Sequence, residues 1–233
     1  MKKTVLKALA VVMCALLLCT SFVGCGGNKA DTYVIGVSGP LTGAAAVYGV
    51  AVKNSAQMAV DEINAAGGEA LAVKANVLDR ASLEEARDVV VNHFGKIDIL
   101  INGAGGNNPR ATTDNEYQHE AKEGGKSFFE LDPNGVDFVF KLNFQGTLLP
   151  TQVFAKDMVA RKSGNILNIS SMNAYIPLTK IPAYSAAKAG ISNFTQWLAT
   201  HFAGTGIRCN AIAPGFLVSA QNRALLFNED GTP

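Results

Sequence analysis

The stretch Ile97-Asp-Ile-Leu-Ile-Asn-Gly-Ala-Gly-Gly106 is a short apolar strand that leads directly into a glycine-rich turn. An apolar strand of this length, over residues 97–101, is typical of a parallel sheet that is buried on both faces. Strands and helices alternate outward from it. Further strands are predicted at 70–77, 165–169 and 208–213, and helices at 82–93, 136–162 and 184–202. The alternation predicts an α/β fold built on a doubly wound parallel sheet.

Capping residues and helix breakers refine these boundaries. Ser82, with Glu85 three residues later, has the pattern of a capping box and predicts a helix start at residue 82. Pro150 predicts a kink within the helix at 136–162. The long polar stretch 107–134 is unusual for a compact domain, so we interpret it as a functional loop.

Three short segments follow directly after predicted strands: Asn102-Gly-Ala-Gly105, Ser170-Ser171 and Pro214-Gly215. In doubly wound sheets, ligands bind outside the carboxyl ends of the strands. The three segments are therefore predicted to meet at one ligand-binding edge.

Tyr184 and Lys188 lie four residues apart at the start of a predicted helix, so their side chains share a face. A free tyrosine has a pKa of roughly 10, which is high for acid–base work at neutral pH. A nearby ammonium favours the phenolate and is expected to lower that pKa. With Ser171 thirteen residues before Tyr184, the pair predicts a proton donor and acceptor beside a hydroxyl that holds a carbonyl oxygen.

The net charge and the spacing of the histidines argue against two other classes of function, nucleic-acid binding and metal binding. The formal net charge of +1 gives no reason to expect a nucleic-acid partner. His93, His119 and His201 are scattered, so no metal site is predicted. Cys209 lies in an apolar run and is interpreted as a small buried hydrophobe.

The N-terminus has the pattern of a targeting segment. Lys2, Lys3 and Lys7 precede an apolar stretch over 8–19, and Phe22-Val-Gly-Cys25 resembles a bacterial lipobox. Residues 1–25 are thus predicted to be a lipoprotein-type signal with lipidation at Cys25, and an uncleaved anchor is the alternative. A strand at 32–37 and a helix at 44–66, ended by Gly67-Gly68, follow.

From about residue 67 to 233 the chain resembles the short-chain dehydrogenase/reductase family, and most closely its D-mannonate oxidoreductase-like branch. The motifs that carry the resemblance are Asn102-Gly-Ala-Gly105, Asn143 in Leu-Asn-Phe-Gln-Gly, Ile169-Ser-Ser171, Tyr184-Ser-Ala-Ala-Lys188 and Asn210-Ala-Ile-Ala-Pro-Gly215. The resemblance implies a Rossmann-like sheet, a bound NAD or NADP, and hydride transfer to or from a sugar acid or polyol.

The resemblance also implies roles for individual residues. Tyr184 would protonate the substrate oxygen, Lys188 would lower its pKa and bind the nicotinamide ribose, and Ser171 would orient the carbonyl. Asn143 would hold a water in the proton relay. The implied cofactor-binding residues are Asn76, Val77, Asn102, Gly103, Ala104, Gly105, Tyr184, Lys188, Pro214 and Gly215.

Residues 26–67 depart from that family and resemble the start of a lipoprotein-type periplasmic binding protein for branched-chain amino acids. The similarity lies in Val34-Ile-Gly-Val-Ser-Gly-Pro-Leu-Thr-Gly43 and Ala59-Val-Asp-Glu-Ile-Asn-Ala-Ala-Gly-Gly68. We therefore expect a fusion of two gene fragments near 65–68, with a dehydrogenase domain over 68–233 that is incomplete at both ends. Ser38-Gly39 with Gly43 also imitates a phosphate-binding turn.

Three hypotheses follow for function: an NAD(P)-dependent oxidoreductase, an inactive chimeric remnant, and a lipid-anchored amino-acid-binding fragment. The partners expected are a small-molecule substrate, a membrane tether through Cys25 and further copies of the chain in a homo-oligomer. The signals for location conflict, because a lipobox directs the chain out of the cytoplasm and a dehydrogenase domain belongs inside it.

Overall fold

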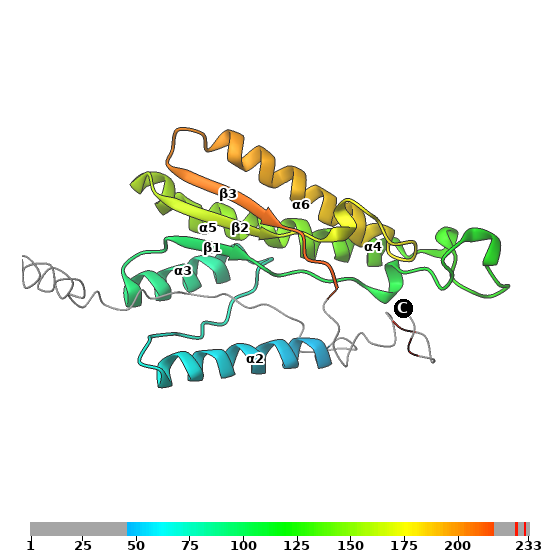
Figure 1. The fold of residues 1–233 in the computed structure, drawn as a ribbon, viewed down its shortest axis with the longest axis horizontal. Coiled ribbons are helices and arrows are strands. Elements are labelled where there is room, and N and C mark those ends of the chain that lie inside the picture. The colour runs from blue at the N-terminus through cyan, green and yellow to red at the C-terminus, as the bar shows by residue number, and fades with distance from the viewer. Residues whose placement is uncertain (1–45, 217–226, 228–230, 232–233) are drawn as a thin grey trace, which may run out of the picture.

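A computed structural model describes residues 46–216 of the chain, together with Phe227 and Gly231 (Figure 1). The main elements, in chain order, are α2 (Ala46–Ala65), α3 (Arg80–Phe94), β1 (Ile99–Asn102), α4 (Pro133–Phe140), α5 (Gly146–Arg161), β2 (Gly164–Ile169), α6 (Pro182–His201) and β3 (Ile207–Ile212). The polar stretch 107–134 contains three single helical turns, η1 (Pro109–Ala111), η2 (Gln118–Glu120) and η3 (Phe128–Glu130), and η5 (Met172–Ala174) follows β2.

The three strands form one parallel sheet in the order β1-β2-β3. Ile99 of β1 pairs with Asn165 of β2, and Ile166 of β2 pairs with Cys209 of β3. Helices connect the strands, as parallel pairing requires. The predicted α/β class and the parallel sheet are confirmed.

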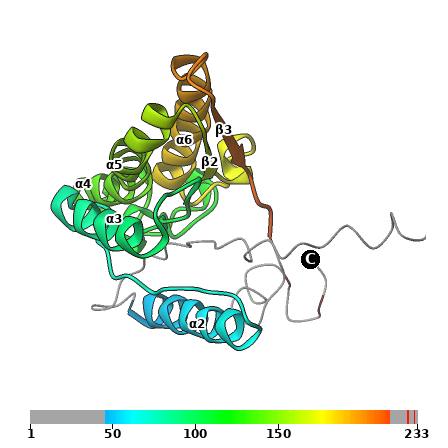
Figure 2. The same cartoon turned by 90° about the vertical axis from the view of Figure 1, so that its left-hand side faces the viewer.

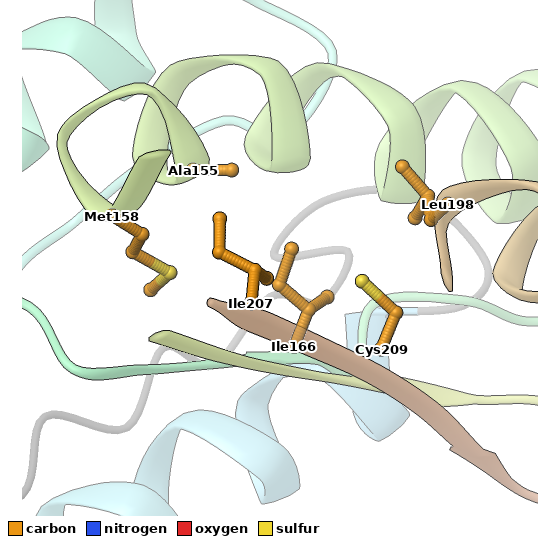
Figure 3. Packing of buried hydrophobic residues seen from close by; sticks show 6 residues of the cluster. All are labelled: Ala155, Met158, Ile166, Leu198, Ile207 and Cys209. Carbon is orange, nitrogen blue, oxygen red and sulfur yellow. The ribbon is translucent and has the colours of Figure 1, made fainter. Parts of the chain in front are cut away.

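Helices α3, α4, α5 and α6 lie on one side of the sheet (Figure 2). Alternate residues of β2 and β3 point toward this layer because side chains alternate along a strand. The main cluster packed there is shown in Figure 3 and consists of Ala155, Met158, Ile166, Leu198, Ile207 and Cys209. Met158 and Ile166 are fully buried, and Cys209 is 7% exposed, which confirms its predicted place in the core.

The opposite face of β1 is open within the described residues, so the predicted burial of this strand on both faces is wrong. Ile99 and Ile101 each keep 38% of their surface exposed. The reason is that α3 to α6 cover a single side, whereas α2 lies apart from them (Figure 2). Most of the described side chains of α2 are exposed, including Met58 at 62%.

Residues 70–77 are extended but belong to no sheet, so the strand predicted there is not formed. Burial still alternates along this segment: Leu71, Val73, Ala75 and Val77 are half-buried, and the residues between them are exposed. A strand requires a neighbour to complete its ladder of hydrogen bonds. Here an apolar cavity of about 110 Å³ lies between the segment and β1.

The observed end of helix α2 agrees with the sequence-based prediction, whereas the observed start of helix α3 differs from it. Helix α2 ends as predicted, because Gly67 takes a φ of +83° and the Gly68 amide donates to the Ile63 carbonyl at 3.0 Å. Helix α3 begins earlier than predicted, with Asp79 as its N-cap. The Ser82 hydroxyl instead accepts a hydrogen bond from the Asn76 amide at 2.9 Å, so the predicted capping box at Ser82 is wrong.

The predicted helix over 136–162 is interrupted by a π-helical turn at Lys141–Gln145, and not at Pro150. Asn143 explains the position. Its side-chain amide donates to the Val139 carbonyl at 2.8 Å, which is the carbonyl one turn earlier in the helix. A side chain inserted into the backbone ladder in this way widens a helix locally. Such π-turns are frequent at functional sites.

Candidate active site

The loops after β2 and β3 meet at the carboxyl edge of the sheet. The Ser170 amide donates to the Ile212 carbonyl at 2.8 Å, and the Met172 amide donates to the Pro214 carbonyl at 3.1 Å. Gly215 is nearby, since a Cβ on it would lie 3.9 Å from the Met172 sulfur. The predicted meeting of these two strand ends is thus confirmed.

Helix α6 brings Tyr184 and Lys188 to the same edge. The Lys188 Nζ lies 5.6 Å from the centre of the Tyr184 ring, as their spacing predicts. The Ser171 side chain lies close enough to the Tyr184 hydroxyl to lower its pKa. The Ser171 hydroxyl also caps the turn η5, because it accepts from the Asn173 amide at 3.2 Å. The loop after β2 therefore holds Ser171 in place beside the tyrosine.

Burial sets the titration of Lys188. The side chain is 4% exposed, and its Nζ donates to the Ile169 carbonyl at 2.8 Å. Loss of water around the ammonium lowers the pKa of Lys188 from 10.5 to about 8.

Burial also raises the pKa of Tyr184, and the hydrogen bond with Ser171 opposes that shift only in part. The direction is opposite to the expected lowering by Lys188. The ammonium is directed at the Ile169 carbonyl, and the cost of burying a phenolate outweighs its attraction. Tyr184 is therefore a protonated phenol at neutral pH, the form that donates a proton.

The depressed pKa of Lys188 predicts a pH-dependent difference in stability between the native chain and Lys188→Met. The unfolded chain binds this proton up to about pH 10.5 and the folded chain only up to about 8. The native chain should therefore gain stability relative to the variant between these values, and the difference should be flat below pH 7. The full shift corresponds to about 3 kcal/mol.

Urea unfolding of both proteins at pH 6, 7, 8, 9 and 10 measures this difference. Subtraction of the two curves removes every group that both proteins share. A difference in unfolding free energy that stays constant from pH 7 to 10 would show that Lys188 keeps its ordinary pKa.

Asn143 and Gly105 form the wall next to Lys188. Asn143 is fully buried, and its amide donates to the Gly106 carbonyl at 2.7 Å and accepts from the Gly106 amide at 3.2 Å. A Cβ on Gly105 would lie 2.6 Å from the Asn143 Oδ1 and 3.1 Å from the Lys188 Nζ. The backbone of the turn after β1 thus packs directly against Asn143 and Lys188. This close contact leaves no space for a side chain at residue 105, which explains why a glycine is present there.

Asn102 occupies a different environment from the one its predicted role implies. Its side chain is 5% exposed and donates to the Thr151 hydroxyl at 2.9 Å and to the Asn168 Oδ1 at 2.8 Å. The Asn168 amide in turn donates to the Thr195 hydroxyl at 2.8 Å. Asn102 therefore ties β1 to β2, α5 and α6 and does not present its amide at the edge. Sequence reasoning missed this network, whose only signal was an Asn in the middle of an apolar strand, at 168.

Asn168→Ala should destabilise the fold by about 2–4 kcal/mol, because it leaves one buried N–H of Asn102 without its acceptor and opens a cavity. Asn193→Ala is the matched control on exposed surface of α6, and its cost should stay within 0.5 kcal/mol. Thermal and urea unfolding of the two variants measure the difference. Equal stability of both would show that the network contributes nothing.

The remaining predicted site residues that the structure describes make contacts with other parts of the fold. The Asn76 Oδ1 accepts from the Leu78 amide at 3.0 Å and so closes the turn before α3. Val77 packs against Gly146, where a Cβ would lie 3.0 Å from the Val77 Cγ2. Gly103 and Ala104 border the apolar cavity beside β1. Cys25, the predicted lipidation site, lies outside the described residues.

The polar stretch 107–134 is docked beside the site. The Thr113 amide donates to the Lys180 carbonyl at 3.0 Å, which joins the stretch to the segment before α6. The Lys126 amide donates to the Asp114 Oδ2 at 2.7 Å. Across residues 46–216 no group of acidic, histidine and cysteine side chains has the arrangement of a metal site. The same residues hold no helix that is both long and apolar enough for a membrane span.

A parallel sheet with a serine, a tyrosine and a lysine gathered at its carboxyl edge defines a Rossmann-like α/β protein with an acid–base site. The chain belongs to the short chain dehydrogenase family, whose model matches residues 41–229. The match begins before the predicted junction at 67 and includes α2, so it places no boundary there.

Individual relatives agree with this family. An uncharacterized oxidoreductase of Haemophilus influenzae is 62% identical over 180 residues, which cover 77% of this chain and 63% of the relative. A solved structure from Haemophilus influenzae, a proposed D-mannonate oxidoreductase with bound NAD, is 61% identical with a TM-score of 0.72. It is matched over 77% of this chain and 65% of its own. A gluconate 5-dehydrogenase from Burkholderia cenocepacia, with NADP and tartrate, is 26% identical with a TM-score of 0.62, over 76% of this chain and 64% of its own. The chain therefore spans just under two thirds of these relatives.

Proposed function

We propose that the chain is an NAD(P)-dependent oxidoreductase that transfers hydride between the nicotinamide and the carbonyl or alcohol carbon of a sugar acid or polyol. D-Mannonate and its keto form are the substrates we favour. The observation that carries the proposal is the cluster of Ser171, Tyr184 and Lys188 at the carboxyl edge of the sheet, with Asn143 behind Gly105. The high identity to a protein solved with NAD supports the choice of cofactor.

The residues present fit the nicotinamide end of such a cofactor. The turn after β1 has no side chain at Gly105, which leaves its backbone open to close approach. Lys188 would hold the ribose, and Pro214 and Gly215 would border the ring at the end of β3. When bound, the nicotinamide supplies the hydride chemistry, and the protein supplies position and the proton.

The side chains of the site would act on the substrate oxygen. Ser171 would donate a hydrogen bond to the carbonyl oxygen and so orient it next to Tyr184. Tyr184, a protonated phenol at neutral pH, would deliver its proton to the oxygen during reduction and take it back during oxidation. Asn143 would hold the π-turn and the Gly106 backbone beside Lys188, and the family resemblance implies that it also holds a water in the proton relay.

Fluorescence and absorbance of the full chain test this function. Saturable quenching of NADH or NADPH fluorescence is expected, followed by reduction of NAD or NADP in the presence of D-mannonate. Ribitol, xylitol and D-gluconate serve as comparison substrates. A chain that is folded by circular dichroism but binds neither dinucleotide at millimolar concentration would be the inactive chimeric remnant, and the proposal would fail.

We infer separately that residues 1–25 direct the chain to the membrane surface through lipidation of Cys25, and that residues up to about 67 derive from a solute-binding lipoprotein. The support is the lysine-rich start, the apolar stretch and the lipobox-like tetrapeptide in the sequence. Metabolic labelling with a fatty acid should mark the native chain and leave Cys25→Ala unmarked. Equal labelling of the native chain and Cys25→Ala, or label in neither, would refute the membrane tether.

The proposed fusion has a separate test, which is a continuous sequence read of the native DNA across codons 60–75.

A further inference from the structure

The Ser170 side chain has no part in the proposed chemistry, yet it is almost fully buried beside the site. It is 2% exposed and follows directly after β2. Its hydroxyl oxygen lies 3.1 Å from the Lys188 carbonyl oxygen and 2.7 Å from the Ser192 hydroxyl oxygen, both on α6. A buried hydroxyl thus joins the end of the strand to the helix at the residue that carries the ammonium of the site.

The direction of these two hydrogen bonds follows from the number of hydrogens available. A serine hydroxyl carries a single donor hydrogen, and a carbonyl oxygen can only accept. Ser170 therefore donates to the Lys188 carbonyl, which leaves Ser192 as the donor to Ser170. The result is a short chain of hydrogen bonds from Ser192 through Ser170 to the Lys188 carbonyl. Hydrogen bonds linked in this way strengthen one another in a buried environment.

The side-chain end of Lys188 is held at the same strand end. Its Nζ donates to the Ile169 carbonyl at 2.8 Å. Within residues 46–216 no carboxylate forms an ion pair with this ammonium, so its position depends on the backbone around it. Ser170 comes directly after Ile169, and its amide is fixed to β3 by a hydrogen bond to the Ile212 carbonyl at 2.8 Å. The main chain and the ammonium of one lysine are therefore attached to two consecutive residues.

We propose that Ser170 and Ser192 are positioning residues, which hold the backbone of α6 at Lys188 against the end of β2 and so set where the ammonium lies. This role rests on the proposed function, in which Lys188 binds the nicotinamide ribose beside Tyr184. It gives a purpose to two side chains that the proposed mechanism does not use. The effect can be large, because a displacement of about 1 Å at a catalytic group costs roughly 100-fold in rate.

The titration of Lys188 tests the positioning without cofactor or substrate. Burial holds the pKa of Lys188 at about 8, so an ammonium released from its place gains water and its pKa rises. In Ser170→Ala the helix loses its hydrogen bond to the strand end, and the pKa of Lys188 should rise by at least about 0.5. Nitrogen NMR of the lysine side chains in the full chain measures the pKa, and Lys188→Met identifies the signal.

Thr195→Ala is the matched control for this titration. It removes a buried hydroxyl from the same helix, two turns beyond Lys188, and this hydroxyl donates to the Ile191 carbonyl at 2.8 Å. The variant should be less stable, but the pKa of Lys188 should stay within about 0.2 of its native value, because separate sites act independently. An equal rise in both variants would show that Ser170 acts only through general stability. That result, or no rise in Ser170→Ala, would overturn the proposal.

Rates at Ser192 keep the test valid if Ser170→Ala fails to fold. Ser192 is half-buried, and Ser192→Ala removes only the first donor of the chain of hydrogen bonds. The variant should lower kcat roughly 5-fold or more and leave the KM for D-mannonate nearly unchanged, because the hydroxyl positions a catalytic group and does not bind substrate. Ser192→Thr restores a hydroxyl at this position and should recover at least half of the native kcat.

The outcomes separate this role from the proposed function. A native kcat in Ser192→Ala, or a loss that Ser192→Thr does not recover, would overturn the proposal. A chain without hydride transfer whose Lys188 pKa still rises in Ser170→Ala, and not in Thr195→Ala, would refute the proposed function and leave the positioning of the lysine supported.

Discussion

Tyr184→Phe is expected to lower kcat for the proposed oxidation of D-mannonate roughly 1,000-fold, within the range that general acid–base catalysis supplies. The change removes only the hydroxyl that Ser171 contacts. The ring keeps its packing in the cluster of Ala111, Val139, Ala183 and Ala187, so the fold and the binding of NADH should be nearly unchanged. Steady-state absorbance of NADH at saturating substrate measures kcat, and fluorescence quenching measures the affinity for the dinucleotide.

Tyr117→Phe is the matched control, because Tyr117 is 53% exposed and is not a member of the acid–base cluster. It should keep the native kcat within a factor of two. A Tyr184→Phe protein that retains more than a tenth of the native kcat would mean that another group transfers the proton. Loss of dinucleotide binding together with kcat would mean that the Tyr184 hydroxyl serves to bind the cofactor and not only to transfer the proton.

Gly105→Ala is expected to cost at least 100-fold in kcat/KM. The new Cβ would lie 2.6 Å from the Asn143 Oδ1 and 3.1 Å from the Lys188 Nζ, distances that force both side chains to move. Asn143 is fully buried and holds three hydrogen bonds, so it has little freedom to yield. A displacement of about 1 Å at a catalytic group is sufficient for a loss of this size. Initial rates at several concentrations of substrate and NAD measure it.

Gly106→Ala is the adjacent control. A Cβ at Gly106 would lie 3.8 Å from the Leu142 Cδ2, which is an ordinary contact. At least half of the native activity should remain, and the melting temperatures of the two variants locate any loss of stability. If both alanine variants were equally active, the close packing of Gly105 on Asn143 and Lys188 would be irrelevant to catalysis.

The candidate acid–base site could be predicted from the sequence because each of its residues belongs to a short, local sequence pattern. Tyr184 and Lys188 are one helical turn apart, and Ser171 follows a strand, so backbone geometry alone brings them to one edge. Asn143 came only from the family resemblance, and the π-turn that carries it was not foreseen. The pKa of Tyr184 was predicted in the wrong direction, since its burial depends on residues distant in the sequence, such as Ala111 and Val139.

The network around Asn102 was beyond prediction for the same reason. Its partners Thr151, Asn168 and Thr195 come from three other elements, and no spacing in the sequence relates them. The resemblance assigned Asn102 to the cofactor, whereas its hydrogen bonds assign it to the core. The extended segment 70–77 shows a related limit, because its alternating pattern is that of a strand but pairing requires a neighbour.

The sequence by itself determined the α/β class, the parallel pairing of the strands, the C-terminal end of α2 and the gathering of Ser171, Tyr184 and Lys188 at one edge of the sheet. Each of these depends on residues near one another in the chain, where period, capping and turn chemistry act. Only the tertiary structure decided that one face of the sheet is covered, that burial lowers the pKa of Lys188 to about 8, and that an apolar cavity lies beside β1. Burial and pairing are properties of contacts between distant segments, and such contacts exist only once the chain has folded.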